Sequence, residues 1–587
     1  MGRFIAAIVV FAVALVFLTT GIAFKISSGP RTITEKVRIP DTATYAVIDA
    51  SVLSAHPGVQ SVIVSGATTN MVAYGRTIDV QSWIGTSPYL NVSRTKTGKV
   101  VAKRVMSTVD PEAVAATIVN PDGSDMWLEH DSGVASASLS TILPPDMSII
   151  VSGDGTEPVP SSLVFVWPLA SPTFLFLQDD QLMFLGGGIT LVGIALLFSA
   201  VSHYRRKQGP RRRTPKPPKP RKIARSRHGG IPSVPARGRR ASQRRAMIAI
   251  PLALVVGFSL ASCTSPYQTG QQADTPTPTK TTDSQGLDLP PVVVTEPQMR
   301  VIMQNIATLA AQADTNLDGN AAATRFAENA LEARRANYAL RKVDGAIPPI
   351  AAVPDFAPSL FLPEATNTWP RSILAVFQPR NTDPNAEKAP TTAMILQQNS
   401  PRENYLILYQ LSLQASQTVP EVAAADLGAV RVAADSKLLV LPPESLAAAY
   451  ADVIAKGDNS AFAELFDSAG DALRPALQAE RAQQAADNVA VSYSDSAGAG
   501  SVIALASATS GAIVAVSVDE NARFEPQGGR SLKLTGNLKA LAGTELSPKP
   551  VNATYQIQLL FFVPAVGSDQ KITLLGYSEN LTKVAME

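Results

Sequence analysis

The residue of this chain with the clearest chemical use is Cys263, the only cysteine among its 587 residues. A single cysteine excludes an intramolecular disulfide bond and makes a cysteine-based metal cluster implausible. Arg244 and Arg245 precede an uncharged and largely apolar run at residues 246–262, and small residues stand immediately before the cysteine. A charged start, an apolar middle and a small-residue end are the three parts of a secretory signal. The sequence therefore predicts a signal segment that ends at Cys263.

The last four residues of this signal are Leu260, Ala261, Ser262 and Cys263. They resemble the lipobox of bacterial lipoproteins. The resemblance implies that the cysteine thiol receives a diacylglyceryl group and that the cysteine becomes a new N-terminus after cleavage. We therefore expect residues 246–263 to act as a lipoprotein-type signal with Cys263 as the lipidation site. An uncleaved third hydrophobic segment is the alternative.

Two longer apolar segments indicate that the chain is held in a membrane. Residues 4–24 and 182–202 are 21 residues long each and carry no charged side chain. A helix rises 1.5 Å per residue, so either segment can cross a hydrocarbon core of about 30 Å. We expect transmembrane helices within residues 1–25 and at residues 182–202.

Basic residues gather on one side of the second apolar segment. Of the 51 Lys and Arg residues, 17 lie between His203 and Met247, where no Asp or Glu occurs. The other 34 stand against 48 acidic residues, so the total of +3 hides a balance of −14 outside this loop. Lys and Arg beside a span remain in the cytoplasm. We therefore expect residues 203–245 to be cytoplasmic, and residues 26–181 and 264–587 to lie outside a bacterial cytoplasmic membrane.

The basic loop combines like charge with many prolines, most densely at residues 211–222. Such a segment cannot bury enough apolar surface to fold, and its composition predicts an extended, disordered loop. Anionic lipid attracts Lys and Arg by about 1 kcal/mol each near the surface. We expect the loop to bind the inner leaflet, with nucleic acid or an acidic protein as alternative partners. The neighbouring signal argues against a nuclear location, so of these partners we expect anionic lipid and not nucleic acid.

The segment between the two apolar helices, residues 26–181, has the pattern of an all-β exported domain. Short runs rich in β-branched and aromatic residues are separated by glycines and turn sequences, which is typical of a small sandwich or barrel. One short helix is expected at residues 111–118. The expected strands lie at residues 45–53, 61–65, 71–84, 100–109, 138–143, 148–152 and 163–167.

Three pieces of this region carry a family resemblance: residues 45–49 (YAVID), 73–77 (AYGRT) and 126–129 (MWLE). They resemble an actinobacterial family of two-span membrane proteins without assigned function. The resemblance covers about residues 1–205. It implies a membrane location and supplies no catalytic motif.

The part after Cys263 begins with a tether at residues 264–294, where Thr, Pro, Gln and Ser predict disorder. A capping box formed by Thr295 and Gln298 predicts the first helix of an α+β exported domain at residues 295–587. Two halves, each with helices on a curved antiparallel sheet, would resemble nuclear-transport-factor-like or cystatin-like folds. Further helices are expected at residues 320–342, 443–456, 461–466 and 471–487, and strands at 372–377, 392–397, 404–413, 489–493, 502–507, 513–518, 531–541, 552–562 and 571–579.

A second resemblance concerns residues 336–341 (ANYALR) and 368–371 (TWPR). They resemble an actinobacterial lipoprotein family of unknown function, over about residues 255–587. Together with the first resemblance, this implies a two-span membrane protein fused to a lipoprotein.

Two motif-like segments fail as catalytic or metal sites. Ser93 and Lys96 match S-x-x-K, and the same lysine begins a K-T-G triplet. Penicillin-binding enzymes use two different lysines far apart in sequence, so one lysine cannot serve both motifs. Residues 314–319 copy the start of an EF-hand loop, but Arg325 occupies the position that needs a bidentate glutamate. We expect no metal and no cofactor.

These observations predict a non-enzymatic cell-envelope membrane protein or lipoprotein that binds or scaffolds an envelope polymer or protein. The alternative is an envelope enzyme that acts on polysaccharide or peptide. Nothing in the sequence pairs two carboxylates across a cleft for such an enzyme. The first choices for ligand contacts are Trp369, Arg371, Tyr405 and Tyr409, for which packing inside the domain is the other interpretation. The carboxylates available to an enzyme include Asp355, Glu364 and Glu403.

Overall fold

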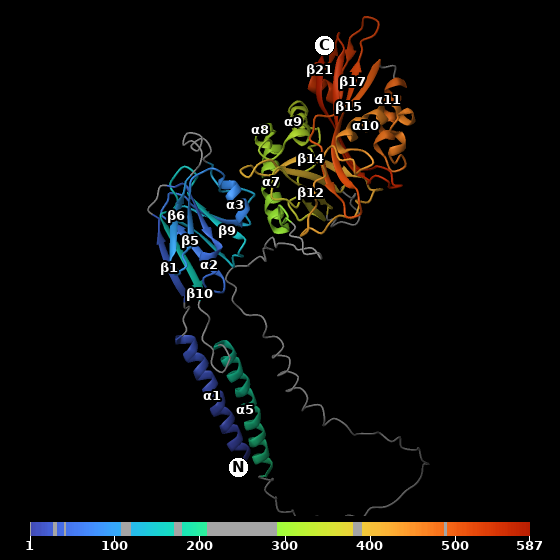
Figure 1. The fold of residues 1–587 in the computed structure, drawn as a ribbon. Helices are drawn as coiled ribbons and strands as arrows, with labels where there is room; N and C mark the ends of the chain where they lie inside the picture. The colour runs from blue at the N-terminus through green and yellow to red at the C-terminus, as the bar shows by residue number, and fades with distance from the viewer. Residues whose placement is uncertain are drawn as a thin grey trace, which may run out of the picture. The chain divides into compact units, whose positions relative to one another are not determined.

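A computed structural model gives the fold (Figure 1). It divides into two compact units, Met1–Ile33 with Trp167–Ala273, and Thr34–Val166 with Asp274–Glu587. The predictions for the signal at 246–263 with its lipobox, and for the helix at 111–118, fall outside the described residues. Most of the loop at 203–245 and of the tether at 264–294 also falls outside them. The described residues are 2–27, 32–39, 43–106, 119–168, 179–207, 290–379, 390–486 and 490–587.

The first unit contains two long apolar helices, α1 (Gly2–Ser27) and α5 (Asp179–Lys207). Both are long and apolar enough to cross a membrane, over Phe4–Ala23 and Gln181–Arg205. This agrees with the two apolar spans expected from the sequence, and the helices extend a few residues beyond the uncharged runs.

The two helices pack closely and run antiparallel. The rings of Phe4 and Tyr204 meet edge to face, with their centres 6.4 Å apart. Near the other end of α1, a Cβ built on Gly186 would lie 2.8 Å from the Leu18 side chain. Such small residues let helix backbones approach one another where hydrophobic burial gives no net drive for association.

Two open sheets make up the β domain, which we define as residues 34–166. The four-stranded sheet has the order β1-β10-β3-β8 and the six-stranded sheet the order β6-β5-β2-β9-β4-β7. Neither sheet closes on itself, so the predicted β-structure takes the open rather than the barrel form. The elements are β1 (Thr32–Arg38), β2 (Tyr45–Asp49), α2 (Ala50–Leu53), β3 (Gln60–Ser65), β4 (Asn70–Arg76), α3 (Thr77–Ile84), β5 (Tyr89–Arg94), β6 (Val100–Val105), β7 (Glu129–Gly133), β8 (Ser136–Thr141), β9 (Met147–Ser152) and β10 (Ser162–Pro168).

Burial shows which faces of these sheets are covered. Side chains of β3 alternate between buried and half-buried positions, as on a sheet with one covered face. Every residue of β4 and β9 is buried, so the six-stranded sheet is covered on both faces at these two neighbouring strands, whereas the edge strands β6 and β7 are largely exposed. One of these faces carries Tyr45 and Ala73, which pack in a cluster with Trp83 of α3.

The strand expected at residues 71–84 was wrong in its second half. The strand ends at Arg76, and helix α3 follows it directly. The buried residues of α3 are Asp79, Val80, Trp83 and Ile84, which repeat at helical spacing and not at the period of two that a strand needs. The strand expected at residues 45–53 likewise ends at Asp49, where α2 follows it. Strands β1, β5 and β7 were not expected.

The C-terminal domain, defined here as residues 290–587, is built on one antiparallel sheet. Its order is β11-β12-β13-β14-β21-β20-β17-β15, with β16 paired to β17. The strands are β11 (Leu360–Pro363), β12 (Arg371–Phe377), β13 (Thr392–Gln398), β14 (Leu406–Leu413), β15 (Val491–Ala497), β16 (Ile503–Ala506), β17 (Ala512–Phe524), β20 (Val551–Val563) and β21 (Thr573–Met586), beside the short pair β18 (Leu532–Lys533) and β19 (Leu546–Ser547).

Helices lie on this sheet in two groups. The capping box of Thr295 and Gln298 opens the first helix, as the sequence predicted. Pairing of Ser412 with Tyr577 joins the two helix-and-strand halves into one continuous sheet. The helices are α7 (Glu296–Asn316), α8 (Gly319–Ala322), α9 (Glu328–Val343), α10 (Pro443–Lys456), α11 (Leu473–Ala486) and α12 (Gly536–Ala542), with 3-10 turns at Gly457–Asn459 and Ala463–Leu465.

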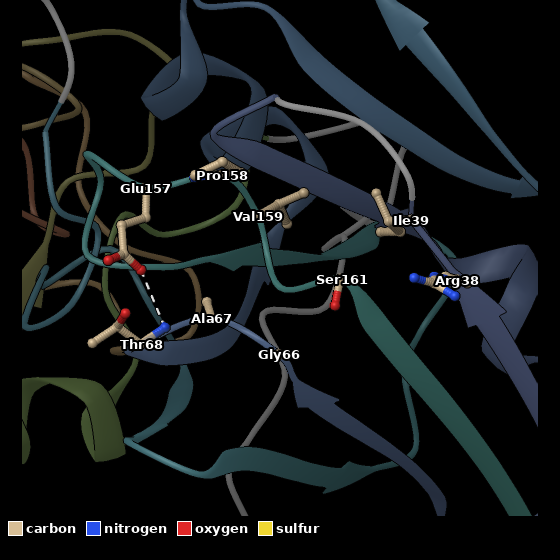
Figure 2. A pocket seen from close by; sticks show the side chains of 9 residues that line it. All are labelled: Arg38, Ile39, Gly66, Ala67, Thr68, Glu157, Pro158, Val159 and Ser161. Atoms are coloured by element: carbon tan, nitrogen blue, oxygen red, sulfur yellow. Dashed lines mark hydrogen bonds between the residues drawn. The ribbon is translucent and has the colours of Figure 1, made fainter.

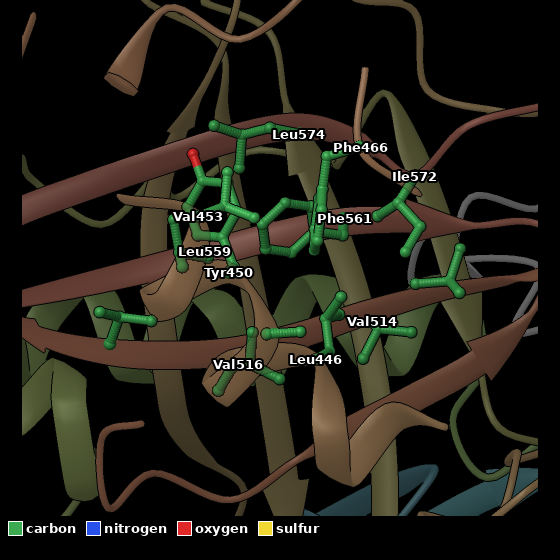
Figure 3. Close-up of a cluster of buried hydrophobic side chains, with 14 of the residues drawn as sticks. Leu446, Tyr450, Val453, Phe466, Val514, Val516, Leu559, Phe561, Ile572 and Leu574 are labelled. Carbon is green, nitrogen blue, oxygen red and sulfur yellow. The ribbon is translucent and has the colours of Figure 1, made fainter. Parts of the chain in front are cut away.

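In the half of the C-terminal domain that contains α10, a cluster of buried hydrophobic side chains lies between this helix and the sheet, and aromatic rings meet within it (Figure 3). The ring of Phe561 on β20 meets Tyr450 of α10 at 4.9 Å and Phe466 at 5.9 Å between ring centres. All three side chains are buried. A separate cluster fills the space between α7, α9 and strands β12 to β14, so each half has its own helix-to-sheet core.

Three expected elements of this domain differ in the structure. The helix expected at residues 461–466 is only the 3-10 turn Ala463–Leu465. The strand at 531–541 was wrong, because β18 is short and α12 replaces the rest between Gly536 and Gly543, both at positive φ. The single helix expected at 320–342 is divided into α8 and α9. Between them, the chain turns so that the N–H of Ile407 on β14 donates to the carbonyl of Arg325.

Candidate functional site at the interface of two domains

The β domain and the C-terminal domain belong to the same compact unit and contact each other directly. In the ion pairs that join them, the β domain supplies the carboxylate and the C-terminal domain supplies the arginine. The β domain contributes two buried carboxylates, Asp79 and Asp125, and the C-terminal domain contributes the guanidinium groups of Arg325, Arg371 and Arg402. Buried charges are tolerated when they are paired and hydrogen-bonded.

The first ion pair centres on Asp79, in the first turn of α3. Nη2 of Arg371, the first residue of β12, donates to Oδ1 of Asp79 at 2.7 Å. Arg76, at the end of β4, also donates to this carboxylate, from Nε at 2.5 Å and from Nη2 at 3.0 Å. Burial lowers the pKa of Arg371, and the neighbouring Asp79 carboxylate opposes this. One carboxylate thus binds one arginine from each domain.

The second ion pair centres on Asp125, which lies in the segment before β7. Arg325 donates to both of its carboxylate oxygens, at 2.5 and 3.1 Å, in the two-point geometry that guanidinium and carboxylate share. The backbone of Asp125 is held as well: its N–H donates to Oδ1 of Asn404 at 2.9 Å, and its carbonyl accepts from Nε2 of Gln298 at 2.7 Å. The N–H of Tyr405 also donates a hydrogen bond to Oδ2 of Asp125, at 2.9 Å.

The third contact closes the end of helix α3. The last carbonyls of a helix have no partner within it, and a cation there is favoured by the helix dipole. Arg402 donates to the carbonyl oxygens of Trp83 at 2.7 Å and Ile84 at 2.8 Å, and to the hydroxyl of Ser87 at 2.9 Å. A side chain of the C-terminal domain therefore caps a helix of the β domain.

An aromatic contact lies beside these ion pairs. Trp369 of the C-terminal domain packs against the cluster that contains Trp83 and Trp127. The guanidinium of Arg371 lies over the Trp369 ring, 3.6 Å from its centre. The indole N–H of Trp369 donates to Oε1 of Gln398 at 3.0 Å, which fixes the ring from its own domain.

Three of the four residues chosen from the sequence, Trp369, Arg371 and Tyr405, lie at this interface. Tyr409 lies within the C-terminal domain, where its hydroxyl donates to the carbonyl of Ser501 at 2.7 Å. Burial raises the pKa of Tyr405 and of Tyr409. All four side chains contact protein here, and contact with a ligand stays a prediction.

Asp79, Asp125 and Arg402 were not predicted as site residues, and Arg325 was noted only because it occupies the position where an EF-hand loop needs a glutamate. One local signal was present: an aspartate at position 79 stands between apolar residues of a short helix, and such a carboxylate needs a buried partner. Its partner, Arg371, is 292 positions away along the chain.

The carboxylates considered for an enzyme occupy different surroundings. Glu364 is buried, accepts from the N–H of Ser372 at 2.9 Å and lies 3.4 Å from Arg431. Burial raises the pKa of Glu364. Asp355 and Glu403 are exposed. Among the residues that the structure describes, no group of three or more His, Cys, Asp and Glu could hold a metal ion.

An open cavity of about 750 Å³ lies in the β domain (Figure 2). Glu157 accepts a hydrogen bond from the N–H of Thr68 at 3.1 Å across its wall. Arg38 and Glu157 are the titratable side chains among its lining residues, so this cavity offers no pair of acid and base groups of the kind that hydrolysis needs. The lining residues are Arg38, Ile39, Gly66, Ala67, Thr68, Glu157, Pro158, Val159 and Ser161.

A second polar cluster surrounds Arg481 of α11 within the C-terminal domain. Its guanidinium donates to Asp495 at 2.7 Å and to Glu520 at 2.6 Å. Desolvation by the surrounding sheet, followed by repulsion from Glu480 and Glu520, raises the pKa of Glu579 on β21 to about 7, although this residue keeps part of its surface exposed to solvent. Two or more carboxylates compete here for one cation.

The raised pKa of Glu579 predicts that the stability of the domain depends on pH. Because the folded-state pKa of Glu579 lies above the ordinary value, the folded protein binds this proton more tightly than the unfolded chain. Stability from this group is therefore present at low pH and falls as pH rises towards about 7. We expect Glu579→Gln to flatten this fall and to raise the urea midpoint at pH 8. The urea midpoint is measured between pH 5 and 8, with Asp569→Asn at an exposed position as the control. If the urea midpoints of Glu579→Gln and the wild type change with pH in parallel, the expectation is contradicted.

Comparison with known proteins places the larger part of this arrangement in one family. A family model described as a domain of unknown function (DUF8094) matches residues 290–585. The match begins just before α7 and contains all three interface arginines, whereas the β domain and the two apolar helices lie outside it. No curated protein and no solved structure matches the chain. Since the match spans just over half of its length, the chain belongs to the DUF8094 family, whose function is unknown.

Proposed function

We propose that this protein is a non-enzymatic binding or scaffolding module of a bacterial cell envelope, anchored in the membrane and directed at an envelope protein or wall polymer. The observation that carries the proposal is the interface between the β domain and the C-terminal domain. The charged residues of this interface form ion pairs with each other, as Asp79 does with Arg371. Side chains of this kind serve binding and positioning, and they leave no free acid and base for hydrolysis.

The proposal includes how the protein is anchored and oriented. Two apolar helices, the lipobox at residues 260–263 and the basic loop at 203–245 support a lipid-anchored protein with both folded domains outside. The resemblances found in the sequence support an actinobacterial origin and a fusion of a two-span protein with a lipoprotein. The repeated order of helices and strands supports two similar halves in the C-terminal domain, of the nuclear-transport-factor-like or cystatin-like kind.

The orientation can be tested by thiol labelling on whole cells. Val134 is 79% exposed and therefore suits a cysteine probe in the β domain. In a Cys263→Ala background, we expect Val134→Cys to react with a membrane-impermeant thiol reagent, and Ser226→Cys to react only after the cells are broken. Labelling of Ser226→Cys in intact cells without labelling of Val134→Cys would contradict the exported orientation.

The binding role is tested with the purified full-length chain in detergent. The chain is sedimented with insoluble cell-wall material, and in parallel it is cross-linked in living cells and its partners are identified by mass spectrometry. We expect retention by the wall or by a reproducible envelope protein, without release of soluble wall fragments. Release of fragments would favour the enzyme, and absence of both retention and cross-linked partners would contradict the binding role.

A further inference from the structure

We infer that the C-terminal domain binds the β domain as a separable partner, so that the two remain together when the chain between them is cut. The inference rests on the proposed function in one respect: cleavage at Cys263 would make this contact the bond between a two-span protein and its lipoprotein. The physical contact itself does not depend on where the domains lie in the cell. Its recognition chemistry is two buried carboxylates and a helix end on one side, and three arginines on the other.

The first argument is the distribution of charge. The cross-domain ion pairs place arginines on the C-terminal domain and aspartates on the β domain, as in Arg325 with Asp125. Both members are almost fully buried, with side-chain exposures of 8% and 1%. Complementary charge of this kind speeds association, fixes the register of two surfaces and rejects partners that lack the opposite charge.

The second argument is that each surface is organised by its own domain. Arg76 holds the Asp79 carboxylate from within the β domain. On the other side, Trp369 supports the guanidinium of Arg371, and the capping box of α7 holds Gln298. A preorganised surface loses less conformational freedom on binding, which leaves more of the contact energy for affinity.

The third argument is the type of residue at the centre. Tryptophan and arginine are enriched among residues that dominate binding energy, especially where partners exclude water. Trp369 is inserted against the aromatic cluster of Trp83 and Trp127, next to the pair of Arg371 and Asp79. An interface with this composition does not need a covalent linker to hold it at micromolar concentration.

The experiment uses the full chain with a protease recognition sequence inserted between Asp274 and Thr275, in a Cys263→Ala background. Cutting there leaves residues 1–274 with all apolar segments and residues 275–587 without lipid or apolar span. The cut sample, in detergent at a few micromolar, is captured by an N-terminal tag and passed through gel filtration. Residues 275–587 should remain with residues 1–274.

Charge variants identify the interface. We expect Asp125→Arg to weaken retention at least tenfold, and the swapped pair Asp125→Arg with Arg325→Asp to restore most of it. The matched control is Arg523→Glu, a reversal in an ion pair at the surface of the C-terminal domain, which should leave retention unchanged. Circular dichroism and thermal unfolding of the released fragment check that it stays folded.

The inference is overturned if the wild-type fragments separate while both remain folded, or if Asp125→Arg is retained like the wild type. If Asp125→Arg fails to fold, Arg402→Glu replaces it, because Arg402 donates across the interface to the carbonyls of Trp83 and Ile84 and to the hydroxyl of Ser87, and it also lies over the Trp83 ring. Failure of thiol labelling or wall binding would leave this result standing, since both of those tests concern the cell and this one is carried out in detergent.

Discussion

Replacement of Asp79 by alanine should destabilise the full chain by about 3–5 kcal/mol, the range for removing one partner of a buried ion pair. The substitution leaves the guanidinium of Arg371, whose side chain is 1% exposed, without its carboxylate, and Arg76 loses the same partner. Urea unfolding in detergent, followed by tryptophan fluorescence, measures the loss. Trp83 and Trp369 flank the site and report on it.

Two further variants separate the buried charge from other effects. Asp79→Asn keeps the shape and removes the charge, so it should fall between alanine and the wild type. Glu545→Ala removes one member of an exposed pair with Lys539 and should change the unfolding curve little. If Asp79→Ala unfolds like Glu545→Ala, the ion pair with Arg371 does not hold the two domains together.

Truncation of Phe561 should have a similarly large effect inside the C-terminal domain. The side chain is 0% exposed and meets the rings of both Tyr450 and Phe466, so alanine at this position leaves a cavity between α10 and the sheet. Large-to-small changes of this kind cost about 3–5 kcal/mol. The measurement is the free energy of unfolding in urea.

Controls for this prediction differ in how much of the cavity they fill. Phe561→Leu keeps part of the volume and should cost less than alanine, about 1–3 kcal/mol. Val566→Ala, at a position that is 64% exposed, should cost little. Equal losses for Phe561→Ala and Val566→Ala would show that the cluster in Figure 3 is not a tightly packed core.

Elements of the C-terminal domain with strong local signals could be predicted from the sequence. The capping box at Thr295 marks the start of α7, and Gly457 ends α10 at the expected residue, because caps and helix stops depend on neighbours along the chain. Short helices such as α3 and α12 were taken for strands. Each spans only about two turns, too few to show a helical period against the apolar background.

The interface could be predicted only in fragments. Arg371 and Tyr405 were selected from the sequence as candidate ligand contacts, with packing inside the domain as the other interpretation, and neither interpretation identifies a partner in the β domain. Asp125 and Arg325 are 200 positions apart, and a single sequence contains no local pattern that links such residues. The two apolar helices are the opposite case, because length and the absence of charged residues mark them without tertiary contacts. The lipobox, which four adjacent residues mark, stays a prediction.

The most direct test of the interface is a double-mutant cycle between Asp125 and Arg325 in the full chain. Asp125→Ala, Arg325→Ala and the double variant are unfolded in urea, with a second cycle between Asp125 and the distant Arg523 for comparison. Residues in contact couple by about 0.5–3 kcal/mol, whereas distant residues add to within about 0.3–0.5 kcal/mol. We expect Asp125 and Arg325 to couple by at least about 1 kcal/mol and Asp125 and Arg523 to be additive. Additive losses in both cycles would show that the β domain and the C-terminal domain are not held together by this contact.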